Sequence, residues 1–210
     1  FNDKILSAYL CFNSVPTEET FFKGVKRLEP GHYLIYKDKQ ITIERFFKLE
    51  FEETDKDMDI YVDQIDKAMK DSVIRHFHAD VEVGSLLSSG VDSSYIVSIG
   101  KPDKTFTVGY DNPKYNEITY AEDLSEKLGI HNISKKISQK EYIKNFPKLM
   151  YHMDEPLADP STIALYSISE LASHYVKVIT SGEGADELFG GYNTYQEEVN
   201  QAWYMKIPFP

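Results

Sequence analysis

A regular alternation of short apolar segments with longer amphipathic ones constrains the fold of this chain more than any other feature. Four stretches with strand character follow one another along the sequence, at 81–87, 105–110, 131–137 and 176–181. Helical hydrophobic periodicity marks the segments between them. Strands that alternate with helices, and that are short and largely apolar, form parallel sheets covered on both faces. The sequence therefore predicts an α/β fold with a doubly wound parallel sheet.

Boundary signals support the predicted helices. Gly129 stands where a C-terminal glycine belongs in a helix over 116–129. Ser138 and Glu141 have the spacing of a capping box, which begins a helix that ends near Met150. Further helices are expected over 57–77, over the residues that precede Pro102, and over 161–175.

The first part of the chain follows a different pattern. Residues 1–15 are expected to form a short amphipathic helix, and alternating residues on both sides of a polar turn predict a hairpin over 33–47. The stretch 50–59 is charged and poor in apolar residues, which is typical of a linker. The sequence therefore divides into a small helix and hairpin segment, 1–50, and an α/β domain, 57–210.

Charge and cysteine content argue against some classes of partner. The chain has 34 acidic and 23 basic residues, a net charge of -11, whereas a nucleic-acid or anionic-membrane surface needs clustered lysine and arginine. Neither partner is expected, and no apolar run approaches the ~18 residues of a membrane span. The single cysteine, Cys11, cannot form an internal disulfide, which fits a reducing, cytoplasmic compartment. We expect its side chain to be buried on a helix face.

The stretch SSGVDSS, residues 88–94, lies where the first strand of the predicted sheet ends and the next helix begins. Ligands of doubly wound sheets bind beyond the carboxyl ends of the strands, and the unpaired N–H groups of a helix start form an anion site. Gly90 would let the backbone approach a ligand closely. Hydroxyl donors would come from Ser88, Ser89, Ser93 and Ser94. A phosphate cradle is the favoured interpretation, and a solvated helix-capping loop is the alternative.

Acidic residues add a second element to this site. Asp92 within a phosphate cradle suggests a bound divalent metal, here magnesium, with a helix cap as the alternative. The stretch SGEGADELFGGY, 181–192, follows the fourth strand and contains Glu183, Asp186 and Glu187 among four glycines. These carboxylates suggest a second metal ligand or a countercharge for a cationic group. For Glu187, the alternative is that it anchors the loop.

Four motifs in this order resemble a single family: LLSSGVDSS, TFTVGY, DEPLADPS and SGEGADELFGGY. They are similar to the synthetase domain of glutamine-hydrolysing asparagine synthases, in the PP-loop ATP pyrophosphatase superfamily. The upstream stretch VPTEETFFKGVKRLEPGHYLIY resembles the segment that joins the glutaminase domain of that family to its synthetase domain. The resemblance covers nearly the whole chain and implies an adenine nucleotide alpha hydrolase-like fold. Residues 1–50 would then be a linker or remnant of the glutaminase domain, and 57–210 a C-terminally truncated synthetase domain.

The resemblance implies an ATP-dependent, amide-forming ligase of asparagine biosynthesis. Enzymes of this family adenylate the side chain of aspartate with release of pyrophosphate, and ammonia derived from glutamine then displaces AMP. The implied cofactors are ATP and Mg²⁺, and the implied partner is a glutaminase domain of the same polypeptide, in a cytoplasmic protein compatible with a homodimer. Two alternatives stay open. One is a related adenylating amidotransferase with another carboxylate substrate, as in β-lactam synthetases, and the other is a non-catalytic nucleotide-binding module.

The resemblance also assigns roles to individual residues. Glu183 matches a catalytic residue that interacts with the adenylate or the incoming amine, and Asp92 and Asp186 match the metal ligands. The positions for pyrophosphate are Ser88, Ser89, Gly90, Val91, Asp92, Ser93 and Ser94, and those around the adenosine are Leu86, Val108, Ser181 and Gly182. If the strands follow the superfamily order 3-2-1-4, the loops after the first and fourth strands are neighbours.

The chain departs from the pattern of the family in three places. Ser89 stands where the family usually has glycine. The N-terminal catalytic cysteine of the glutaminase domain is absent, and the family's catalytic lysine would lie beyond Pro210. We therefore expect a piece of a longer protein that is inactive alone.

Overall fold

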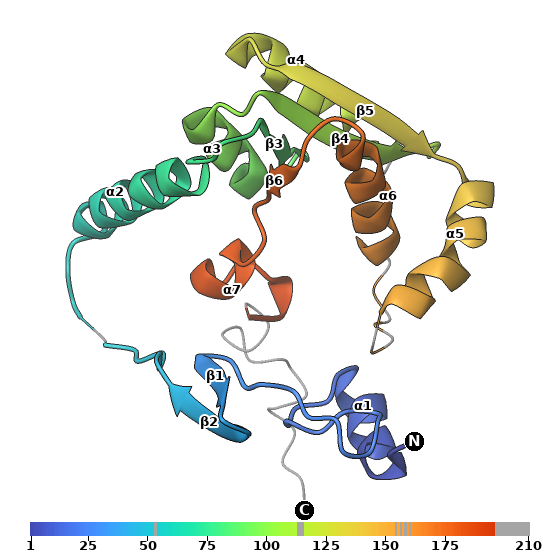
Figure 1. Ribbon diagram of the computed structural model, residues 1–210. Helices are drawn as coiled ribbons and strands as arrows, with labels where there is room; N and C mark the ends of the chain where they lie inside the picture. Colours follow the sequence, from blue (N-terminus) through green and yellow to red (C-terminus); the bar gives the residue numbers. More distant parts are fainter. Residues whose placement is uncertain are drawn as a thin grey trace, which may run out of the picture. The chain divides into compact units, whose positions relative to one another are not determined.

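The computed structural model describes residues 1–52, 54–112, 116–153, 155, 157, 159 and 161–195 (Figure 1). Along the chain, the elements are η1 (Asp3–Ile5), α1 (Leu6–Phe12), β1 (His32–Lys37), β2 (Gln40–Arg45), α2 (Met58–His76), β3 (Val83–Leu86), α3 (Val91–Gly100), β4 (Lys104–Tyr110), α4 (Ile118–Leu128), β5 (His131–Ile137), α5 (Gln139–His152), α6 (Ser161–Ser173), β6 (Val178–Thr180) and α7 (Ala185–Phe189). They form two compact units. One comprises Phe1–Tyr61 and the described residues of Asn145–Thr162, and the other the described residues of Val62–Lys144 and those from Ile163 onward.

The second unit is built on a parallel four-stranded sheet. Its strand order is β5-β4-β3-β6, so the third, second, first and fourth strands along the chain lie side by side. β3 pairs with β4 on one side and with β6 on the other, for example through Ser85 opposite Thr105 and Thr180. This confirms the predicted sheet and the order 3-2-1-4. The order reverses between β3 and β6, so the loops that follow these two strands are neighbours.

Helices cover both faces of this sheet, as the sequence predicts. On one face, the fully buried Phe106 of β4 packs with Ile168 and Ala172 of α6. On the other face, Leu87 packs with Val97 of α3 and Ala121 of α4. Complete burial of a large apolar side chain stabilises the fold by about 1.5–3 kcal/mol. The unit therefore has a core on each side of the sheet, and the segment that follows β3 is anchored in one of them.

The predicted helix boundaries are largely confirmed. Gly129 ends α4 in the left-handed conformation, with a φ of 70°, which glycine adopts without steric cost. Ser138 Oγ accepts a hydrogen bond from the backbone N–H of Glu141 at 3.2 Å, as a capping box requires. The carboxylate of Glu141 instead forms an ion pair with Lys135 at 2.6 Å. Half of the predicted capping box is therefore present.

The first unit contains the predicted hairpin. β1 and β2 are antiparallel and joined at Asp38 and Lys39, whose φ angles of 51° and 61° are those of a type I′ turn. The helical segment is shorter than expected, since α1 ends at Phe12 and Asn13 is left-handed. The burial predicted for Cys11 is wrong, because the residue is exposed. The proposed boundary between 1–50 and 57–210 stays a prediction.

Among the described helices, none has the length and apolar character needed to cross a bilayer.

Candidate nucleotide site

The serine-rich loop lies at the carboxyl end of β3. The strand ends at Leu86, Leu87 is buried, and α3 begins at Val91 with Gly90 as its N-cap. The first N–H groups of a helix lack intrahelical acceptors and carry the positive end of the helix dipole. The loop therefore has the strand–loop–helix setting that the sequence predicts for an anion cradle.

Hydroxyl groups of the loop hold its own backbone. Ser93 Oγ accepts a hydrogen bond from the N–H of Ser88 at 3.2 Å and shares a hydrogen bond with Ser88 Oγ at 2.9 Å. Ser88 Oγ also accepts the N–H of Gly90 at 3.1 Å, and Ser94 Oγ donates to the Gly90 carbonyl at 2.7 Å. Three of the four serines thus shape the loop, in addition to their predicted role as phosphate donors.

The fourth serine, Ser89, meets a residue that the sequence analysis did not single out. Its backbone N–H donates to Glu117 Oε2 at 3.0 Å. Glu117 directly precedes α4, beyond the carboxyl end of β4, which neighbours β3 in the sheet. Glu117 follows the end of β4 by seven positions, and no local pattern in the sequence pairs it with Ser89. Ser89 is exposed and does not have a positive φ, so serine replaces the usual glycine there without backbone strain.

The stretch 181–192 contains a helix that was not predicted. α7 has only five residues and is bounded by Gly184 and Gly190, with φ angles of 93° and 67°. A helix this short between glycines has too few residues to show a hydrophobic period. The structure places Asp186 in the first turn of this helix.

Gly182 brings this stretch against the serine-rich loop. A Cβ atom added to Gly182 would lie 3.1 Å from the Cβ of Asp92 and 3.1 Å from the backbone nitrogen of Ser93. Only a residue without a side chain allows this approach without displacement of α3. The loops that follow β3 and β6 are therefore in direct contact, as the strand order requires.

Three carboxylates assigned from the sequence have no internal partner among the described residues. Asp92, Glu183 and Asp186 form no side-chain hydrogen bond or ion pair with any residue that the structure describes. Asp92 lies in the first turn of α3 and Asp186 in the first turn of α7. Ionised carboxylates without partners are available to a ligand or a cation.

Glu187 has a different environment. Its Oε1 accepts a hydrogen bond from the Tyr192 hydroxyl at 2.7 Å. This bond lowers the pKa of Glu187 below its usual value and raises the pKa of Tyr192 to about 12. The contact closes the turn after α7, which supports the alternative in which Glu187 anchors the loop.

The carboxylates fit a magnesium ion that is shared with phosphates. No group of three or more acidic, histidine or cysteine side chains capable of holding a metal occurs within the described residues. Mg²⁺ commonly takes one or two carboxylates from the protein and completes its six oxygen ligands with water and substrate phosphates. The unpartnered carboxylates of Asp92 and Asp186 suit this mode, in which the protein alone does not form a complete cage.

The residues matched to adenosine-binding positions lie near the carboxyl ends of three strands. Leu86 is the last residue of β3, Val108 lies two residues before the end of β4, and Ser181 and Gly182 directly follow β6. All four are half-buried. Leu86 and Val108 pack against the cluster that contains Phe106, so they belong to the same face of the sheet. In the motif DEPLADPS, residues 154, 156, 158 and 160 lie outside the described residues.

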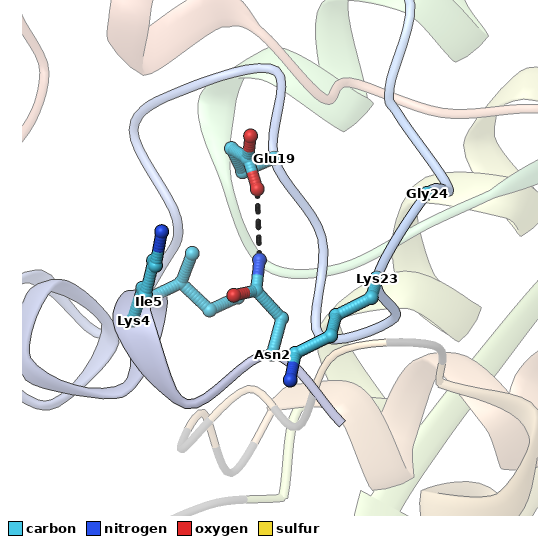
Figure 2. Close-up of a pocket in the computed structure, with 6 residues that line it drawn as sticks. All are labelled: Asn2, Lys4, Ile5, Glu19, Lys23 and Gly24. Carbon is cyan, nitrogen blue, oxygen red and sulfur yellow. Dashed lines mark hydrogen bonds between the residues drawn. The ribbon is translucent and has the colours of Figure 1, made fainter.

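A separate pocket of about 350 Å³ occurs in the first unit (Figure 2). It is lined by Asn2, Lys4, Ile5, Glu19, Lys23 and Gly24. Asn2 is buried and donates from Nδ2 to Glu19 Oε2 at 2.8 Å. This pocket contains none of the residues assigned to nucleotide or metal binding.

Comparison with known proteins identifies relatives of the chain. The family model for asparagine synthase matches residues 64–208. Asparagine synthetase [glutamine-hydrolyzing] 1 of Bacillus subtilis is 44% identical over 208 residues, which are 97% of this chain and 33% of that protein. A putative asparagine synthetase [glutamine-hydrolyzing] of Mycobacterium bovis is 36% identical over 217 residues, covering 99% of this chain and 33% of that protein. The chain thus spans about a third of the length of these curated relatives.

The solved structure of an NMN synthetase from Francisella tularensis is 18% identical and has a TM-score of 0.43, over 66% of this chain and 59% of that one. This likeness is too weak to support any assignment. The family model, by contrast, includes both contacting loops, 88–94 and 181–192. The chain belongs to the asparagine synthase family.

Proposed function

We propose that this chain forms the nucleotide-binding core of an ATP-dependent, amide-forming ligase that adenylates the aspartate side chain. The observation that carries the proposal is the contact of Gly182 with Asp92 and Ser93. This contact joins the serine-rich loop, residues 88–94 and hereafter the phosphate loop, to the carboxylate-rich stretch 181–192. The contact lies where the strand order reverses, which is where doubly wound sheets bind ligands. Membership of the asparagine synthase family supports the same assignment.

The proposed reaction has two steps. An oxygen of the aspartate side-chain carboxylate attacks the α-phosphorus of ATP, and the bond between the α-phosphorus and the bridging oxygen breaks to release pyrophosphate. Ammonia derived from glutamine then attacks the acyl carbon, the acyl C–O bond breaks, and AMP leaves with the carboxylate oxygen. The nitrogen loses one proton to water as the amide forms. Glu183, exposed and without a partner among the described residues, is proposed to contact the adenylate or the incoming amine.

In this scheme the loop 88–94 holds the leaving pyrophosphate. The N–H groups at the start of α3 would stabilise the charge that develops as the phosphate bond breaks. Ser89 would have to exchange its hydrogen bond with Glu117 for one with a phosphate oxygen. Leu86, Val108, Ser181 and Gly182 would enclose the adenosine.

Asp92 and Asp186 are the residues proposed to hold magnesium. The ion would neutralise negative charge on the phosphates and orient them. The two carboxylates have no competing partner in the described residues, so no ion pair within that part of the chain has to break first.

The wider context is proposed from the family. Because the chain spans about a third of its relatives, we propose that 57–210 is part of a synthetase domain and that 1–50 is a linker to, or remnant of, a glutaminase domain of the same polypeptide. A cytoplasmic location and a homodimer are further expectations. The piece alone is expected to be inactive.

Aspartate-dependent ATP–pyrophosphate exchange by the full-length protein tests the proposal. Exchange should require Mg²⁺ and should be lost in Asp92→Ala and in Asp186→Ala. Retained exchange in both variants would refute the metal assignment. Exchange that depends on a different carboxylate would favour the β-lactam synthetase-like alternative. ATP binding by calorimetry without exchange for any carboxylate would indicate a non-catalytic nucleotide-binding module.

A further inference from the structure

A buried chain of hydrogen bonds runs beneath the phosphate loop. Thr105 and Thr107 of β4 are fully buried and lie on the face of the sheet opposite Phe106. Thr105 Oγ1 shares a hydrogen bond with Ser125 Oγ of α4 at 2.8 Å. Asn132 Nδ2 of β5 donates to Thr105 Oγ1 and to Thr107 Oγ1, each at 3.0 Å. Thr107 Oγ1 then donates to the carbonyl of Leu87 at 2.9 Å.

The amide group of Asn132 determines which groups donate and which accept in this series of hydrogen bonds. Because its Nδ2 donates to both threonine hydroxyls, each hydroxyl accepts from Asn132 and keeps its own proton for another partner. For Thr107, that partner is the Leu87 carbonyl. Asn132 Oδ1 is buried and has no hydrogen-bond partner in the described part of the chain. If the amide were turned over, Oδ1 would compete for the proton that Thr107 gives to Leu87.

The Leu87 carbonyl belongs to the peptide group that opens the phosphate loop. The oxygen of Leu87 and the N–H of Ser88 lie on the same planar unit, so fixing the direction of one fixes the other. Thr107 holds the oxygen at 2.9 Å, and Ser93 Oγ accepts the N–H at 3.2 Å. The preceding amide is fixed as well, because Leu87 N–H donates to the Phe106 carbonyl at 2.9 Å.

We propose that Thr107, oriented by Asn132, is a positioning residue for the phosphate loop. Its hydroxyl fixes the peptide between Leu87 and Ser88 and so presents the loop in the conformation that binds phosphate. The proposal rests on the proposed nucleotide-binding function. It adds residues on β4 and β5 that lie behind the loop.

Substitution of Thr107 by valine keeps the shape of the side chain and removes the hydroxyl. In the full-length protein, Thr107→Val should weaken ATP and pyrophosphate binding by about tenfold, since an unmade buried hydrogen bond has a cost of that order. Thr105→Val is the matched control, because it removes a hydroxyl from the same strand and network without touching Leu87. It should lower the melting temperature similarly and leave ATP affinity within about twofold of wild type. Thr107→Ser, which restores the hydroxyl, should recover binding.

Amide hydrogen exchange at Ser88 provides a readout that does not depend on nucleotide. It should accelerate in Thr107→Val and not in Thr105→Val. If wild type binds no ATP while this difference is observed, the positioning role stands and the proposed function fails. If both valine variants bind ATP equally and exchange Ser88 equally, the positioning role is overturned. If Thr107→Val does not fold, Asn132→Ala, at a half-buried position, takes its place. This variant should also weaken ATP binding and accelerate amide exchange at Ser88. If it changes neither, the proposal is overturned.

Discussion

Gly182 offers the sharpest test of the contact between the two loops. An alanine there would place its Cβ 3.1 Å from the Cβ of Asp92 and 3.1 Å from the backbone nitrogen of Ser93. Ordinary van der Waals contacts lie at 3.4–4 Å. Because one of the two nearest atoms is backbone, relief requires the start of α3 to move by a few tenths of an ångström. The substitution should therefore displace the phosphate loop.

The size of the effect follows from the cost of overpacking. Insertion of an extra methyl group into a packed region costs about 1–3 kcal/mol. If that cost falls on the loop conformation that binds phosphate, Gly182→Ala should weaken ATP binding by about 5–150-fold. Isothermal titration of ATP into the full-length protein measures this loss, and thermal unfolding measures the accompanying loss of stability.

Gly129→Ala is a suitable control for this variant. Gly129 ends α4 with a φ of 70°, and an added Cβ would meet no atom within 4 Å. Alanine there costs about 1–2 kcal/mol through the left-handed backbone but exerts no force on the loop. Gly129→Ala should therefore lower the unfolding temperature and keep ATP affinity. If Gly182→Ala binds ATP as tightly as wild type, the inferred coupling between the loops is incorrect.

Two further predictions concern side chains near the same loops. In Glu117→Gln, the Ser89 N–H keeps an acceptor but the negative charge is removed. Metal-free pyrophosphate should therefore bind about threefold to tenfold more tightly, as measured by calorimetry. Unchanged or weaker binding would contradict competition between Glu117 and phosphate. In Tyr192→Phe, the pKa of Glu187 should rise toward its usual value when the carboxyl carbon is followed by NMR. In the native protein, the lowered pKa of Glu187 means that this bond stabilises the turn above pH 4.5 and weakens as the pH falls. Because the pKa of Tyr192 is raised, the stabilisation from this hydrogen bond is lost as the pH rises from 10.0 to about 12. An unchanged titration of Glu187 would show that the bond is absent in solution.

Local sequence patterns were enough to predict most of the sheet and its helices. The strand at 131–137 was placed at its observed bounds, and Gly129 and Ser138 marked helix boundaries because their effects act within one turn. Four parallel strands with helices between them have few ways to pack, so the fold class followed from the pattern. The order 3-2-1-4 came from the family resemblance.

Features that depend on tertiary contact were missed. The hydrogen bond between Ser89 and Glu117 joins residues 28 positions apart, and no local signal pairs them. α7 lies between glycines, and its five residues gave no helical pattern in the sequence. Cys11 was expected to be buried because Leu10 and Phe12 flank it, but all three residues are exposed. Apolar neighbours in sequence do not define the buried face of a helix when only one turn or two are formed.

Transfer of an isotopic label tests the proposed adenylation most directly. Aspartate labelled with ¹⁸O in its side-chain carboxylate would be given to the full-length protein with ATP, Mg²⁺ and glutamine, and the products would be analysed by mass spectrometry. Attack at the α-phosphorus followed by amination leaves one labelled oxygen in AMP, and the account predicts that label together with unlabelled pyrophosphate. Label in inorganic phosphate, with ADP as the nucleotide product, would contradict it.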